Sequence, residues 1–277
     1  MDEIAIISDI HGNLQALNTV IKDIKERKIK KIYCLGDLIA KGTHQQECID
    51  IIKNTCEIVI KGNCDEYFTE EKCKSKYCEK DSKRYNWIKN KLNEEAVEYL
   101  KKLPYCYEFY MSGRLIRLLH AHPEKINTMI SNISTFDKYY ELFLPSKNTI
   151  SQETADIIIY GHTHVPYMQK LYNRIVINTG SVGNAVDIYR NDKKDGNVKN
   201  TTVANYVILK GKLDSKKEDK ISYEFINVTY DIEKELEENK DNIEFAEYET
   251  EIRQGKYRNM QRIYDDLKSK GIDINKI

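Results

Sequence analysis

The sequence predicts an α/β fold with a helical segment inserted into it, and three observations support that prediction. Over residues 1–60, short β-branched runs alternate with amphipathic stretches, a pattern typical of a sheet with largely parallel strands and covering helices. Residues 67–102 show no strand pattern, so we interpret them as two or three helices that form a cap. Clusters rich in Asp, Asn and His directly follow the predicted strands, at the edge where α/β sheets bind ligands.

The elements of the N-terminal part are predicted from hydrophobic periodicity. Residues 3–8 form an apolar, β-branched run that predicts a buried strand. A helix is predicted over 13–28, because apolar residues recur there at helical spacing from Leu14 to Ile24. The alternation is completed by a strand at 31–35, a helix at 44–53 and a strand at 57–60.

The rest of the chain is predicted to add further strands and to end in a helical extension. The predicted elements are, in chain order, a hairpin at 105–110 and 115–119, a helix at 126–144, strands at 156–160 and 175–178, a charged loop at 190–199 and a second hairpin at 203–209 and 221–228. Residues 1–230 form the predicted core, which includes the cap, and residues 231–277 form a charged C-terminal helical extension. We interpret this extension as a solvated face or a dimer contact, and the second interpretation would make the chain a homo-oligomer.

Composition argues against several classes of protein. Lys+Arg and Asp+Glu both total 44 in the 277 residues, so no overall positive field is available to hold nucleic acid. No apolar run approaches the roughly 20 residues that a membrane helix needs, and the N-terminus lacks the pattern of a signal peptide. The seven cysteines are odd in number and lie in unlike contexts, which favours free thiols and a cytoplasmic location.

Five short polar clusters hold five of the six histidines, and only His44 lies outside them. The clusters are Asp9-Ile10-His11, Gly36-Asp37, Gly62-Asn63-Cys64-Asp65, His120-Ala121-His122 and Gly161-His162-Thr163-His164. Nitrogen and oxygen ligands without thiolate are typical of sites for Mn, Fe, Zn or Ni, and not of a structural zinc site built from cysteines. One carboxylate can bridge two such ions, which then activate a hydroxide and neutralise charge that develops on phosphoryl oxygens. The clusters therefore predict a two-metal hydrolase that acts on phosphorus.

These motifs, in this order along residues 3–230, resemble those of the calcineurin-like metallophosphoesterases. The resemblance implies a four-layer α-β-β-α sandwich of two mixed sheets with an inserted helical cap. It implies two divalent metal ions, for which we expect manganese, with iron, zinc or nickel as alternatives. One metal would take Asp9, His11, Asp37 and His164, and the other would take Asp37, Asn63, His120 and His162, with Asp37 as the bridge. Among these ligands, we expect Asp37, Asn63 and His120 to be the catalytic residues.

Two positions depart from the family's pattern. Many members have Asn-His-Asp/Glu, in which the histidine protonates the leaving group, and Cys64 stands at that place here. Small bacterial and archaeal phosphodiesterases of the family are similar to this chain in that respect. Ala121 stands where glycine is usual. The stretch from Asn178 to Gly183 resembles the family's Asn-Pro-Gly-Ser loop, with Thr179 in place of proline, and we expect its backbone amides to form a wall near the site.

Three further residues are candidates for the substrate side, each with a structural alternative. His122 faces the substrate or packs beside Pro123. Asp65 supplies polarity on the substrate side or caps a helix N-terminus. Arg84, with the nearby Tyr85 and Trp87, lines a substrate entrance or belongs to an amphipathic helical cover.

The predicted function is hydrolysis of phosphodiester bonds by a metal-activated hydroxide, on a small phosphorylated substrate such as a nucleotide. A diester offers a better leaving group than a phosphorylated protein, so the loss of a general-acid histidine at Cys64 has less effect. One alternative is a nucleotide pyrophosphohydrolase that splits dinucleoside polyphosphates. Another is a non-catalytic scaffold on the same fold, which we would expect to have lost ligands, whereas every ligand position is kept here.

Overall fold

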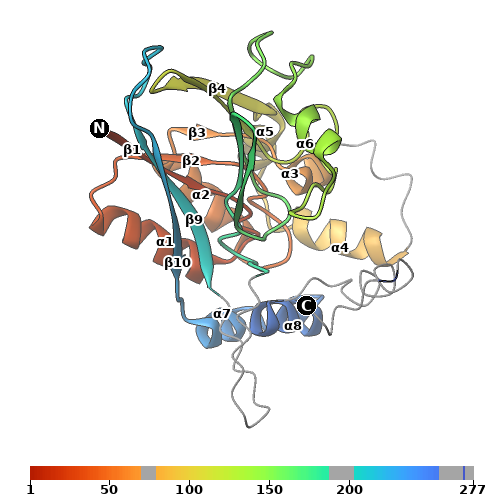
Figure 1. Ribbon diagram of the computed structural model, residues 1–277. Coiled ribbons are helices and arrows are strands. Elements are labelled where there is room, and N and C mark those ends of the chain that lie inside the picture. The colour runs from red at the N-terminus through yellow and green to blue at the C-terminus, as the bar shows by residue number, and fades with distance from the viewer. Residues whose placement is uncertain (70–78, 187–202, 256–270, 272–277) are drawn as a thin grey trace.

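The computed structural model describes residues 1–69, 79–186, 203–255 and 271, and contains two five-stranded sheets with helices around them (Figure 1). The first sheet has the strand order β10-β9-β1-β2-β3. Its strands are β1 (Asp2–Ile7), β2 (Lys31–Cys34), β3 (Ile58–Val59), β9 (Ala204–Gly211) and β10 (Ser222–Val228). β1, β2 and β3 are parallel, whereas β9 is antiparallel to both of its neighbours. The parallel strands are connected by α1 (Leu14–Glu26) and α2 (Gln45–Thr55), so the predicted β-α-β-α-β alternation is confirmed.

The second sheet has the strand order β4-β5-β6-β8-β7. Its strands are β4 (Cys106–Met111), β5 (Arg114–Leu119), β6 (Ile157–Tyr160), β7 (Tyr167–Leu171) and β8 (Arg174–Asn178). The three central strands are parallel, and the edge strands β4 and β7 are antiparallel to their neighbours. The predicted hairpin of β4 and β5 is confirmed, and it turns at Ser112 and Gly113, which both have positive φ angles.

The layers follow from the two-residue period of the strands. In β1, Ile4 and Ile6 belong to the apolar cluster between the two sheets, which also contains Ile116 of β5. Ala5 and Ile7 point to the opposite face and join the cluster that α1 and α2 cover. These four side chains of β1 are fully buried. A strand buried on both faces reads as a continuous apolar run, which is how residues 3–8 were recognised.

The outer face of the second sheet is covered by α6 (Phe136–Phe143). Leu142 and Phe143 of this helix are fully buried in a third apolar cluster, together with Ile158 of β6. Helix, sheet, sheet and helix therefore follow one another, and the predicted α/β sandwich of two mixed sheets is confirmed.

Two predictions of local structure were wrong in the part around α6 and β7. Residues 126–135 form turns instead of helix, because the Ser134 hydroxyl accepts a hydrogen bond from the Ser131 N–H and such local bonds compete with helical ones. β7 was not predicted at all. Three of its five residues, from Met168 to Lys170, are exposed, so the strand shows no apolar alternation.

The inserted segment contributes α3 (Asn63–Thr69), α4 (Glu79–Lys89) and α5 (Glu94–Lys102). Residues 70–78 of the predicted cap lie outside the described residues. Phe68, Ile88 and Leu100 of these helices belong to the same apolar cluster as the buried faces of α1 and α2. The described part of the insertion therefore shares the core of the first sheet.

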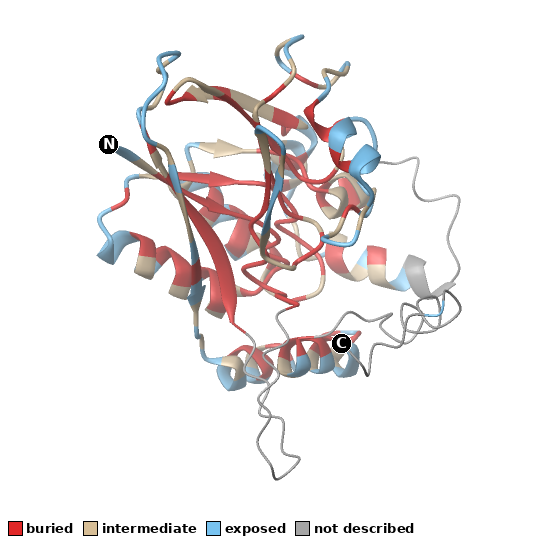
Figure 2. Cartoon of the chain, viewed as in Figure 1, coloured by how far each residue is buried: buried red, intermediate tan, exposed pale blue. Residues whose placement is uncertain are grey.

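The C-terminal part contains α7 (Ile232–Glu238) and α8 (Phe245–Gln254). Figure 2 shows the buried side of α8 turned toward the rest of the molecule. The predicted charged loop at 190–199 and, except for residue 271, the segment after 255 lie outside the described residues. Among the described helices, none has the length and apolar content required to cross a membrane.

Candidate metal centre

The predicted clusters meet where strands of the two sheets end. Asp9 and His11 follow β1, Asp37 follows β2, Asn63 follows β3, His120 follows β5, and His162 and His164 follow β6. β1, β2 and β3 are parallel in one sheet, and β5 and β6 are parallel in the other, so each set has its carboxyl ends on one edge. Asp9, His11, Asp37, His120 and His164 form groups whose ligand atoms lie within 4.8 Å of one another.

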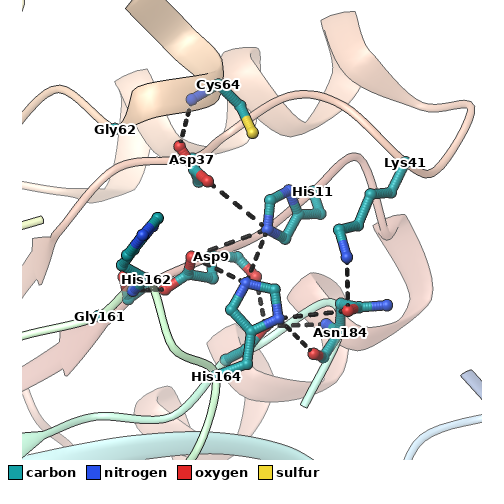
Figure 3. A network of polar contacts seen from close by, with 12 residues as sticks. Asp9, His11, Asp37, Lys41, Gly62, Cys64, Gly161, His162, His164 and Asn184 are labelled. Carbon is teal, nitrogen blue, oxygen red and sulfur yellow. Dashed lines mark hydrogen bonds and ion pairs between the residues drawn. The ribbon is translucent and has the colours of Figure 1, made fainter. Parts of the chain in front are cut away.

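The first group of candidate ligands surrounds His11 (Figure 3). Its Nε2 lies 3.1 Å from His164 Nε2, and 3.7 Å from both Asp9 Oδ1 and Asp37 Oδ2. His164 Nε2 is 3.2 Å from the same Asp9 oxygen. All four side chains are at most 5% exposed.

The second group surrounds His120. Its Nε2 lies 2.9 Å from Asn63 Oδ1 and 3.5 Å from Asp37 Oδ1. The His162 ring packs against the His120 ring at a centroid distance of 5.2 Å. Asp37 therefore presents one oxygen to each group, the arrangement required of a carboxylate that bridges two ions.

Backbone carbonyls fix which nitrogen of each histidine is protonated. The Nδ1 atoms of His11, His120 and His164 lie 3.1, 2.9 and 2.7 Å from the carbonyl oxygens of Ile39, Leu35 and Asn184 respectively. A carbonyl can only accept a hydrogen bond, so Nδ1 carries the proton and Nε2 offers a lone pair in the neutral ring.

The contact between His11 and His164 is therefore unfavourable unless a cation lies between the two rings. Two Nε2 lone pairs at 3.1 Å repel each other and cannot form a hydrogen bond. Burial, together with His164 and Lys41, lowers the pKa of His11 well below its usual value, which favours the neutral ring with a free Nε2 lone pair. This observation favours a bound metal ion.

Two buried atoms give the same indication. Asp9 Oδ1 and His162 Nε2 have no hydrogen-bond partner among the described residues, although buried polar atoms are rarely left unpaired. The other Asp9 oxygen accepts bonds from the Ser8 hydroxyl at 2.6 Å and from the His162 N–H at 2.9 Å. Burial, with His120 and other groups, lowers the pKa of His162 to about 3, which keeps its ring neutral and able to ligate. The donor set thus fits divalent ions that prefer nitrogen and oxygen.

The backbone is strained at most of these positions. Asp9, His11, Asp37, His162 and His164 all have positive φ angles, between 52° and 65°. Residues other than glycine rarely adopt this conformation, and such strain concentrates at functional sites. This backbone conformation directs two side chains that follow one strand, such as those of Asp9 and His11, toward the same candidate metal centre.

Close packing explains two of the motif glycines. A Cβ atom on Gly62 would lie 2.1 Å from Asp37 Oδ1, and one on Gly161 would lie 2.4 Å from Asp9 Oδ2. Any larger residue would displace these carboxylates. The glycines of the motifs are therefore required by the approach of the backbone to the ligand side chains.

Asp65 has different partners from those expected of a residue that faces the substrate. It is fully buried, and its carboxylate accepts hydrogen bonds from the N–H groups of Asp37 at 2.8 Å, Leu38 at 2.9 Å and Gly62 at 2.9 Å. The bond to Gly62 is of the kind made by a capping box, because Asp65 is the third residue of α3 and Gly62 precedes the helix. Asp65 thus holds the backbone of Asp37 in place.

The polar partners of His122 and Arg84 are residues outside the set of candidate ligands. His122 Nδ1 accepts a bond from the Glu124 N–H at 3.1 Å, and its Nε2 lies 3.4 Å from Glu141 Oε2. His122 therefore supports the loop that follows it. Arg84 Nε lies 3.1 Å from Glu244 Oε2, which ties α4 to the start of α8.

Cys64 lies close to the site, in surroundings that favour its neutral thiol. Its backbone N–H donates to Asp37 Oδ1 at 2.7 Å. Its Sγ and the ligand atoms of His11 and Asp37 lie within 4.8 Å of one another. Burial and the adjacent Asp37 raise the pKa of the Cys64 thiol well above its usual value. The thiol is therefore neutral at physiological pH.

A polar network that was not predicted from the sequence contacts the Nδ1 side of His164 (Figure 3). Asn184, whose carbonyl faces His164 Nδ1, also accepts a bond from Lys41 Nζ at 2.8 Å through its side chain. Glu251 of α8 contacts the Asn184 amide at 3.1 Å and Lys41 Nζ at 3.2 Å, and Glu251 is only 2% exposed. Asn184 is one residue beyond the recognised loop, which was the only signal in the sequence.

The loop from Asn178 to Gly183 does not offer the expected wall of amides throughout. The N–H groups of Val182 and Gly183 donate to the carbonyls of Ser8 and Asp9, both at 2.9 Å. Ser181 Oγ donates to the same Asp9 carbonyl at 2.8 Å. The loop clamps the strained backbone at Asp9 instead.

Comparison with known proteins places this geometry in context. Residues 3–197 match the family model of the calcineurin-like phosphoesterase superfamily domain. The chain is 30% identical over 249 residues to an uncharacterized protein of Methanocaldococcus jannaschii, a match that covers 84% of this chain and 90% of that protein.

Solved structures with a similar fold include one from an archaeon and one from a bacterium. A hypothetical protein from Pyrococcus horikoshii OT3 has a TM-score of 0.71 and 19% identity, and a metallophosphoesterase from Sphaerobacter thermophilus has a TM-score of 0.66 and 20% identity. Each comparison covers 92% of this chain and 99% of the other. Since the family model matches well over half of the 277 residues and includes every strand end that supplies a candidate ligand, the chain belongs to the calcineurin-like phosphoesterase superfamily.

Proposed function

We propose that the protein is a metal-dependent phosphoesterase that hydrolyses phosphodiester bonds at a centre of two metal ions. The observation that supports this most is the position of Asp37, which presents Oδ2 to His11 and Oδ1 to His120. Asp9, His11, Asp37 and His164 would hold one ion, and Asp37, Asn63, His120 and His162 would hold the other. Manganese is the ion we propose first, with iron, zinc and nickel as alternatives.

Bound ions would supply positive charge next to the phosphoryl oxygens and a water molecule of lowered pKa. The chain's own residues hold the ligands in position for this. The Nδ1–H groups of the histidines donate to backbone carbonyls, which orients each Nε2 inward. Asp65 holds the backbone of Asp37, and the Val182 and Gly183 amides hold that of Asp9.

Diesters are favoured as substrates because no strong general acid is present at Cys64. Its thiol has a raised pKa through burial, and its Sγ lies 3.5 Å from Asn63 Nδ2. A neutral thiol of high pKa protonates a leaving group poorly near neutral pH. Substrates with good leaving groups, such as aryl diesters and phosphoanhydrides, depend least on that proton.

A screen of the manganese-loaded protein tests the proposal. Bis(p-nitrophenyl) phosphate, p-nitrophenyl phosphate and a dinucleoside polyphosphate are assayed in parallel, with Asp37→Asn as the inactive control. We expect the diester to be hydrolysed faster than the monoester. If the polyphosphate is the best of the three, a pyrophosphohydrolase is the correct description. If the metal-loaded chain hydrolyses none of the three, the proposed function is wrong and a non-catalytic scaffold is the remaining description.

We also propose a cytoplasmic location. The five cysteines that the structure describes are unpaired, and burial raises the thiol pKa of all five. Free, unreactive thiols are typical of proteins that fold in a reducing compartment.

A further inference from the structure

A pocket of about 640 Å³ opens beside the candidate ligand Asn63. It is lined by Asn63, Glu66 and Tyr67 at the start of α3, by Tyr105, by residues 123–127 after β5, and by Lys147 and Asn148 after α6. Its volume is in the range of pockets that bind small molecules and cofactors. Because Asn63 is one of its walls, a molecule in the pocket would be adjacent to the second group of ligands.

Two aromatic rings give the pocket a stacking surface. Tyr67 packs against Phe68 and Tyr85 at ring-centroid distances of 4.7 and 6.3 Å, which fixes its orientation. Tyr105 donates a hydrogen bond from its hydroxyl to Glu66, and Lys61 Nζ lies over its ring at 5.0 Å from the centroid. Rings that are already held in place stack on a planar ligand with little loss of side-chain entropy.

The other walls are polar and carry charges of both signs, with the carboxylates of Glu66 and Glu124 and the ammonium groups of two lysines. Lys125 and Lys147 are exposed, and neither forms an ion pair with the carboxylates that the structure describes. Asn148 Nδ2 donates to the Pro123 carbonyl at 2.7 Å, which connects the two loops that bear the lysines. Apolar aliphatic lining is limited to Pro123 and Ile126, too little for an acyl chain.

We propose that this pocket binds the nucleoside part of a nucleotide-containing phosphodiester or phosphoanhydride. The base would stack on Tyr67 or Tyr105, polar side chains would meet its edges and the sugar hydroxyls, and Lys125 and Lys147 would contact a phosphate other than the one attacked. This inference rests on the proposed function, because it takes Asn63 as part of the reacting centre. It assigns recognition to α3, Tyr105 and two loops, and not to Arg84 or Trp87.

Binding to the manganese-loaded full chain tests the inference without requiring turnover. Adenosine 5′-monophosphate and ribose 5-phosphate carry the same phosphate and sugar and differ only in the base. We expect the nucleotide to bind at least about tenfold more tightly by calorimetry, since stacking of one base on an aromatic side chain contributes that much or more. Tyr67→Leu and Tyr105→Leu should each reduce this ratio several-fold. Tyr172→Leu, which replaces a tyrosine that is 93% exposed on the β7–β8 turn, should leave it unchanged.

The lysines are tested with a second phosphate. Adenosine 5′-diphosphate should bind more tightly than the monophosphate, and the double substitution Lys125→Ala and Lys147→Ala should remove most of that gain. Lys170→Ala, on the exposed edge strand β7, is the matched control. A gain that survives the double substitution would exclude the lysines from phosphate recognition and overturn that part of the proposal.

The outcomes separate the two proposals. Equal binding of the nucleotide and the sugar phosphate would overturn the nucleoside pocket, even if bis(p-nitrophenyl) phosphate is hydrolysed. A base preference that disappears in both tyrosine variants would support the pocket, even if no diester is hydrolysed and the proposed function fails. A base preference that persists in both variants would place the base elsewhere and contradict the inference.

Discussion

Asp37 lies between the two groups of candidate ligands. Its substitution tests metal binding in a chain that still folds. In Asp37→Asn the remaining Oδ1 can still accept the Cys64 N–H, so we expect the chain to fold. We expect hydrolysis to fall to the background rate, because a neutral amide cannot bridge two cations.

The matched comparison is His122→Ala. His122 contacts Glu124 and Glu141 and not the ligand cluster, so its loss should reduce turnover by at most about 10–100-fold, the usual effect of a supporting residue. Asp50→Asn, on an exposed part of α2, controls for the loss of a carboxylate. If His122→Ala were as inactive as Asp37→Asn with its metal content intact, His122 would belong among the catalytic residues.

Asp65 supports the site through the backbone, which predicts an effect on stability. Asp65→Ala would leave three buried N–H groups without an acceptor, those of Asp37, Leu38 and Gly62. We expect the free energy of unfolding to fall by roughly 3 kcal/mol or more, as measured by urea denaturation. Asp50→Ala should change it by less than about 0.5 kcal/mol. Equal values for the two variants would show that Asp65 is not structural.

At the scale of the element, the inserted helices are predicted to unfold together with the core. Leu100 of α5 is fully buried in the cluster that α1 and α2 share, so Leu100→Ala should lower the free energy of unfolding by about 2–5 kcal/mol. Trp87 of α4 is the chain's only tryptophan, so its fluorescence reports on α4 and the part of the core that it packs against, whereas circular dichroism reports on the whole fold.

Both signals should show one coincident transition in the wild type and in Leu100→Ala. Glu98→Ala, which changes an exposed position of the same helix, should leave the midpoint nearly unchanged. Two separate transitions, with only the fluorescence one shifted, would show that the insertion is an independent cap.

The C-terminal helix α8 is predicted to support metal binding through Glu251. Glu251→Ala would remove the acceptor of the Asn184 amide and the partner of Lys41, and Asn184 orients His164. We expect manganese affinity to fall by up to about tenfold in a competition titration with a chelator. The control is Glu249→Ala on the same helix, where Glu249 pairs with the exposed Arg253. Equal affinities of the two variants would exclude a supporting role for α8.

At the scale of the whole molecule, most strands and the placing of the candidate ligands at strand ends could be predicted from the sequence for a simple physical reason. Strands buried on both faces are continuous apolar runs, and ligand residues follow them directly, as Asp9 follows β1 and Asp37 follows β2. Both signals are local. β7 and the turns at 126–135 gave none, since the former is exposed and the latter depend on side-chain bonds such as that of Ser134.

The support of the site could not be predicted, because it depends on contacts between distant parts of the chain. Glu251 approaches Asn184 across 67 residues, and Asp65 reaches back 28 residues to the Asp37 N–H. The positive φ angles of Asp9 and His11 likewise follow from tertiary contacts and not from local propensity. The ion pair between Arg84 and Glu244 of the C-terminal part is another such contact, and it could not be predicted for the same reason.

The metal content of the chain tests the central claim most directly. Protein loaded with manganese and freed of excess ion is measured by elemental analysis, and its crystals are measured at the manganese absorption edge. We expect two ions per chain and two anomalous peaks, one on each side of the Asp37 carboxylate, and we expect Asp37→Asn to lose at least one of them. A single peak, or none, in the loaded wild-type protein would contradict the two-metal centre.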